Sequence, residues 1–82
     1  MKIAVIGGGS WGTTVAHLCA HNTTTQLFAR NSEVARAITT DNENPKYLQG
    51  YELHPELTAA DDLYSVVDGA EVVVMGLSLI HI

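Results

Sequence analysis

The sequence predicts an α/β fold in which helices cover a parallel sheet. Short β-branched apolar segments alternate along the chain with segments of helical periodicity. The first apolar segment shows no polar alternation, which is typical of a strand covered on both faces. Three adjacent glycines then separate this strand from the first helical segment. With 82 residues, the chain has room for one small domain.

The first strand is expected at Lys2–Ile6 and a helix is expected beyond Ser10. Its expected buried stripe follows helical spacing and consists of Trp11, Val15, Leu18 and Cys19. The opposite, polar side carries Thr13, Thr14 and His17. After a polar break, Gln26–Ala29 is predicted as a second strand, which must be parallel to the first because a helix joins them.

The second half of the chain predicts two further helices and two further strands. A helix is expected to start at Asn31 or Ser32. Residues 41–50 are expected to form an ordered loop that buries Tyr47 and Leu48, because Asn44 precedes a proline and so disfavours helix.

A third strand is then expected at Thr58–Ala60. After it, Asp61 is expected to cap a short helix that Gly69 ends. Residues 70–75 are predicted to be a further buried strand.

The composition excludes several classes of function. The net charge of −5, with four Lys and Arg residues against nine Asp and Glu, offers no basic face for a nucleic acid. The single Cys19 and the lack of zinc-ligand spacing argue for a reducing compartment and against a metal site. Since the N-terminus resembles neither a signal peptide nor a membrane span, we expect a cytoplasmic protein.

Gly7, Gly9 and Gly12 match the pattern G-x-G-x-x-G between the first strand and the first helix. Gly7 would make the tight turn, Gly9 would let the backbone approach a pyrophosphate, and Gly12 would let the helix pack closely on the strand. Free amides at the helix start would face the phosphates. The pattern therefore predicts a Rossmann-type, doubly wound, dinucleotide-binding fold, with a glycine turn that binds no ligand as the alternative.

Arg30 follows the second strand, where NAD-binding proteins commonly carry an acidic residue that binds the ribose hydroxyls. A guanidinium can pair with a 2′-phosphate, so the sequence predicts either that NADP is the cofactor or that both NADP and NAD are used. A solvated surface arginine is the alternative. The missing acid also argues against a typical FAD site.

The sequence evidence for other candidate site residues is weaker. Trp11 could belong to the core stripe or lie over the pyrophosphate. The four histidines share no spacing and are expected to be solvated, and Ser10 and Ser78 lack the context of a hydrolase triad.

The segments GGGSWGTTVA, FAR, NENPKYLQG and AEVVVMG together resemble the bacterial NAD(P)-dependent glycerol-3-phosphate dehydrogenases. The resemblance implies reduction of dihydroxyacetone phosphate to sn-glycerol 3-phosphate for phospholipid synthesis. It also implies that Ser10, Trp11, Arg30 and Tyr47 contact the cofactor. Whether the full-length enzyme is a homo-oligomer stays open.

The resemblance ends near residue 76, so residues 1–76 are interpreted as a partial NAD(P)-binding domain. Residues 77–82 depart from the family pattern and are expected to be a truncated or non-native tail. The family's catalytic lysine and its helical substrate domain have no counterpart, so the chain is expected to be inactive alone. The alternatives are another Rossmann reductase, of the ketopantoate reductase or 6-phosphogluconate dehydrogenase type, and a non-enzymatic dinucleotide sensor.

Overall fold

The computed structural model describes residues 1–7 and 9–75. These residues form, in chain order, β1 (Lys2–Ile6), α1 (Ser10–Ala20), β2 (Thr24–Phe28), α2 (Ser32–Asp41), β3 (Thr58–Ala60), α3 (Leu63–Val67) and β4 (Val72–Met75). The expected end of the domain at residue 76 and the expected tail at 77–82 lie outside the described residues. Within the described part of the chain, no helix is long and apolar enough to cross a membrane.

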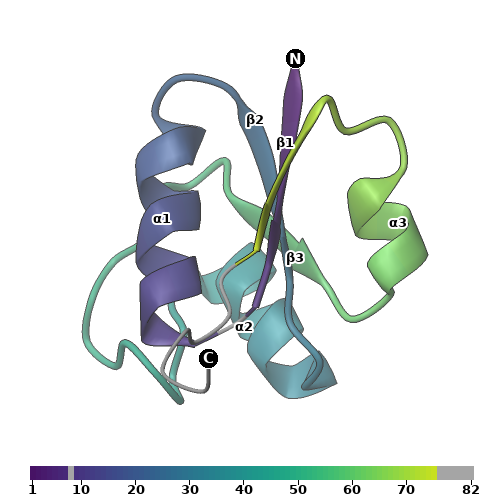
Figure 1. Cartoon of the computed structure of the whole chain (residues 1–82). Helices are drawn as coiled ribbons and strands as arrows, with labels where there is room; N and C mark the ends of the chain where they lie inside the picture. Colours follow the sequence, from purple (N-terminus) through teal and green to yellow (C-terminus); the bar gives the residue numbers. More distant parts are fainter. Residues whose placement is uncertain (8, 76–82) are drawn as a thin grey trace, which may run out of the picture.

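The strands form one parallel sheet in the order β3-β2-β1-β4. The chain runs outward from β1 to β2 and β3, and then returns to the other side of β1. This is the first half of the doubly wound Rossmann order, in which the direction reverses between β1 and β4. Figure 1 shows α1 and α3 on opposite sides of the sheet, which confirms the predicted fold class.

Most predicted element boundaries are confirmed. The second strand was expected at Gln26–Ala29, but β2 spans Thr24–Phe28 because Thr24 and Thr25 pair with the start of β1. Threonine is β-branched and fits a strand despite its hydroxyl. The cap of α3 is Asp62, not Asp61, and its side chain accepts a hydrogen bond from the backbone N–H of Tyr64 at 3.2 Å.

The buried face of α1 differs from the predicted stripe. The buried residues are Gly12, Thr13, Ala16 and Ala20, whereas Trp11 and Leu18 are each 60% exposed. The reason is the close approach of α1 to the end of β1, since a Cβ added to Gly12 would overlap the carbonyl oxygen of Gly7. Only small side chains fit into so narrow a space.

β4 is not the buried strand that was expected. Val72, Val73 and Met75 are about half exposed, at 42%, 47% and 54%. Within the described residues, β4 pairs only with β1 and forms an outer edge of the sheet, and these exposures show that its faces are largely uncovered.

The long segment between α2 and β3 contributes to the core. Leu53 and Leu57 are almost completely buried and pack in one cluster with Val5, Leu27 and Ile38. Asn42, at φ 57°, closes α2, and its carbonyl accepts a hydrogen bond of 2.7 Å from the backbone N–H of Leu53. The loop is therefore ordered, as predicted.

The residue that this loop buries is not the expected one. Tyr47 is 48% exposed and Leu48 is partly buried, whereas the side chain of Asn44 is completely buried. The loop buries an asparagine and not the aromatic ring, because the Asn44 side chain has a hydrogen-bond partner in the interior, the Thr13 hydroxyl.

Candidate functional site

A cavity of about 350 Å³ opens at the carboxyl ends of β1 and β2. Ile6 and Phe28, the last residues of these strands, line it. The other lining residues come from the glycine turn, from the start of α2 and from the loop before β3: Gly7, Gly9, Ala29, Arg30, Asn31, Val34, Lys46 and Tyr47. Ligands of doubly wound sheets bind at this end of the strands.

Two positions of the glycine turn require glycine, each for a different structural reason. Gly7 adopts φ 122°, a conformation that side chains rarely tolerate, and its N–H donates to the Phe28 carbonyl at 3.2 Å. Gly12 is required by its contact with Gly7. Gly9 differs from both, because its φ of −73° suits any residue and a Cβ added there would meet nothing within 4 Å. Space beside Gly9 is thus open to a ligand.

The N-terminus of α1 adjoins this open space. Gly9 is the N-cap, and its carbonyl accepts a hydrogen bond of 2.9 Å from the N–H of Thr13. Among the described residues, no side chain caps this end of the helix and no acidic residue lies in its first turn. The first amides therefore present a partial positive charge that favours an anion.

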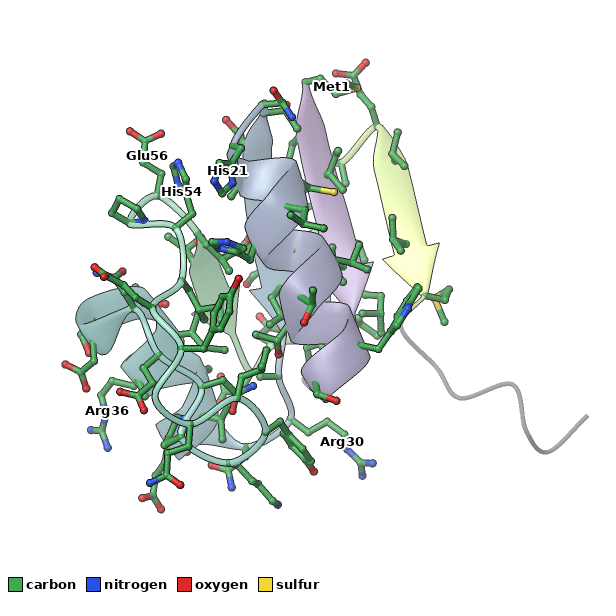
Figure 2. All side chains as sticks on the ribbon, turned by 90° about the vertical axis from the view of Figure 1, so that its left-hand side faces the viewer. Met1, His21, Arg30, Arg36, His54 and Glu56 are labelled. Atoms are coloured by element: carbon green, nitrogen blue, oxygen red, sulfur yellow. The ribbon has the colours of Figure 1, made fainter. Side chains whose placement is uncertain are left out.

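Two cationic side chains, Arg30 and Lys46, line the cavity. They are half of the four Lys and Arg residues of the chain. No acidic residue is among the described residues that line the cavity, although the net charge of the protein is −5. In Figure 2, Arg30 lies beyond the N-terminal end of α1, whereas His21 lies near the opposite end. The cavity is therefore a local positive site on an acidic protein.

The structure brings together four of the seven predicted site residues, since Gly7, Gly9, Arg30 and Tyr47 all line the cavity. Gly12 lies buried behind the turn, and the exposed Ser10 and Trp11 lie in the first turn of α1. Trp11 is thus not a core residue.

Lys46 was missed by sequence reasoning. Its position next to Tyr47, in the loop already assigned to the cofactor, was the available signal.

Three of the four histidines, expected to be solvated and scattered, lie together at the far end of α1. The ring centroids of His17 and His21 are 4.8 Å apart, and those of His21 and His54 are 4.7 Å apart. Figure 2 shows His21 and His54 side by side, away from Arg30. The sequence spacing of the histidines could not predict this cluster, because the loop before β3 brings His54 to α1.

The sheet order, the glycine turn and the positive cavity define the N-terminal part of a Rossmann-type dinucleotide-binding domain. A family model for the N-terminus of NAD-dependent glycerol-3-phosphate dehydrogenase matches residues 2–82. The chain belongs to this family.

Known relatives support the same assignment. The chain is 48% identical over 77 residues to glycerol-3-phosphate dehydrogenase [NAD(P)+] 2 of Sphingopyxis alaskensis, a match that covers 94% of this chain and 23% of that protein. It is 43% identical over 82 residues to the enzyme of Oleidesulfovibrio alaskensis, covering 99% and 25%. Among solved structures, glycerol-3-phosphate dehydrogenase of Saccharomyces cerevisiae superimposes with a TM-score of 0.87 at 30% identity, covering 94% and 26%. The chain thus spans about a quarter of the length of these relatives.

Proposed function

We propose that this chain is the cofactor-binding part of an NAD(P)-dependent glycerol-3-phosphate dehydrogenase. The reaction is the reduction of dihydroxyacetone phosphate to sn-glycerol 3-phosphate, which supplies phospholipid synthesis, in the cytoplasm. Family membership supports this reaction over that of another Rossmann reductase. The observation that carries the proposal is the cavity in which the glycine turn, the α1 N-terminus and Arg30 meet.

The residues present fit a dinucleotide. The volume of about 350 Å³ is in the range of small-molecule sites. Open space beside Gly9 admits a pyrophosphate, and the amides of Ser10 and Trp11, in the first turn of α1, would bind its oxygens. When bound, the cofactor supplies the hydride through its nicotinamide ring.

Arg30 would bind the adenosine ribose end of the cofactor, with Tyr47 as a further wall. A guanidinium attracts a 2′-phosphate, and no carboxylate among the described lining residues repels it. This favours NADP, or use of both cofactors, over NAD alone.

The test combines binding with turnover. Calorimetric titration of the chain with NADPH and NADH should show saturable binding, tighter for NADPH. The product of the complete reading frame should oxidise NADPH only when dihydroxyacetone phosphate is added. Binding without such turnover would favour a dinucleotide sensor, and turnover with ketopantoate or 6-phosphogluconate instead would reassign the substrate.

A further inference from the structure

Asn44 is a buried polar residue that joins the loop before β3 to α1. Its side chain is completely buried, and so is that of Thr13. The Asn44 Nδ2 donates a hydrogen bond of 2.8 Å to the Thr13 Oγ1. Because a buried amide is costly unless it is hydrogen-bonded, this contact strongly favours one position of the loop against the helix.

The same side chain also holds the backbone of the cavity wall. The Asn44 Oδ1 accepts hydrogen bonds of 3.1 Å from the backbone N–H groups of both Lys46 and Tyr47. Pro45, which lies between Asn44 and Lys46 in the chain, restricts the backbone further. The Lys46 Nζ lies 5.4 Å from the centroid of the Tyr47 ring, so the two side chains that line the cavity also contact one another.

Thr13 is in turn fixed to the opposite wall of the cavity. Its backbone N–H donates to the Gly9 carbonyl at 2.9 Å, and its neighbour Gly12 packs on Gly7. A continuous path of hydrogen bonds therefore runs from the glycine turn through Thr13 and Asn44 to Lys46. The hydrogen bond between Asn44 and Thr13 links the two walls in this path.

We propose that Asn44 is a positioning residue for the dinucleotide, which holds Lys46 at the cavity as a second cation, beside Arg30, for a cofactor phosphate. This inference rests on the proposed function. Asn44 does not touch the ligand itself, since it is buried; it acts through the backbone of Lys46 and Tyr47.

The first test is the dissociation constant for NADPH of the chain. Asn44→Ala removes the hydrogen bonds to Thr13, Lys46 and Tyr47 and should weaken binding at least about tenfold, the effect expected from the loss of one buried hydrogen bond alone. Thr13→Val should act in the same direction, and Thr13→Ser, which keeps the hydroxyl, should restore affinity close to the wild type. Thr25→Val is the matched control, because it removes a buried hydroxyl from the opposite end of β2.

The second test separates positioning from general stability. If Asn44 acts through the cavity wall, Asn44→Ala should lower affinity less than about twofold in a Lys46→Ala/Tyr47→Ala background. An undiminished loss in that background would overturn the proposal, as would an unchanged dissociation constant in folded Asn44→Ala.

A measurement without cofactor keeps this inference distinct from the proposed function. Asn44→Ala, or Thr13→Val if the former does not fold, should accelerate amide hydrogen exchange at Lys46 and Tyr47 and leave the β1–β2 amides protected. Equal exchange in variant and wild type would contradict the positioning role. If the wild type binds neither NADPH nor NADH, the proposed function fails and the dinucleotide role of Asn44 fails with it, whereas the exchange result would still establish the loop contact.

Discussion

The backbone N–H of His54 donates a hydrogen bond of 2.9 Å to the Nδ1 of His17, and so joins the loop before β3 to the middle of α1. His17 can accept this bond only while its Nδ1 carries no proton. Other groups face the same point: the rings of His21 and Tyr51 lie edge-on to His17, and His54 Nδ1 accepts a bond from the Glu56 N–H at 3.2 Å. Protonation of the His17 Nδ1 therefore opposes loop attachment.

The first prediction is that folding stability falls in mild acid. Burial lowers the pKa of His17 from 6.5, and the charges of His21 and His54 lower it further. The folded state thus binds fewer protons than the unfolded state, so the His17 contribution is complete above about pH 6.5 and decreases as the pH falls towards and through the lowered pKa. Urea denaturation at about pH 8 and about pH 5.5 measures the difference.

The matched variant is His17→Gln, which removes the titrating ring and keeps a side-chain oxygen acceptor. Its free energy of unfolding should depend less on pH across this range than that of the wild type. The same pH dependence in both proteins would mean that other groups are responsible.

The second prediction concerns Gly12. Alanine is usually about 1 kcal/mol better than glycine inside a helix. Here the added Cβ would overlap the Gly7 carbonyl, so α1 must move away from β1 and overpacking should dominate. Gly12→Ala should reduce the free energy of unfolding by about 1–3 kcal/mol in urea denaturation. An equal or higher stability would show that the turn can relax without loss.

The third prediction is that a side chain at Gly9 affects cofactor binding but not folding stability. Gly9→Val should keep the free energy of unfolding within about 1 kcal/mol of the wild type, because its backbone angles are ordinary and no atom lies within 4 Å of the new Cβ. The branched side chain should occupy the volume of the pyrophosphate and abolish NADPH binding in calorimetry. Gly9→Ala should be intermediate. Full affinity in folded Gly9→Val would refute the phosphate role of the turn.

The sequence predicted elements well where local chemistry decides them. β1 is a continuous apolar segment, and Asn31 caps α2 by accepting hydrogen bonds from the N–H groups of Glu33 and Val34 at 2.8 and 3.2 Å. These signals lie within a few residues of the feature they determine. The parallel α/β sheet followed from the alternation of strands and helices, and the glycine spacing located the turn beside β1.

The errors arose where distant segments decide the outcome. The hydropathy stripe that includes Leu18 was predicted to be the buried face of α1, but the close approach of α1 to the sheet selects Thr13 and Ala16 instead. Nothing near Asn44 in the sequence indicates that Thr13, 31 residues away, supplies its partner. Lys46 was missed for a related reason, since the fold of the loop brings it to the cavity beside the glycine turn.

The last prediction tests the choice of cofactor through Arg30. If its guanidinium pairs with the 2′-phosphate, the charge-assisted bond should contribute about 1.5–3 kcal/mol, or about one to two decades of affinity. Arg30→Asp should weaken NADPH binding by at least that factor, because repulsion is added to the lost contact, and should leave NADH binding equal or tighter. The measurement is the dissociation constant of each cofactor at one ionic strength, since an exposed pair is screened by salt.

Arg36→Asp is the matched control, because it makes the same charge change on α2 at a residue that does not line the cavity. Figure 2 shows the two arginines well separated. Long-range electrostatics alone would weaken NADPH binding similarly in both variants, whereas a direct contact affects Arg30→Asp much more. Equal losses of NADPH and NADH in Arg30→Asp would place Arg30 against a part that both cofactors share, and the preference for NADP would have to be withdrawn.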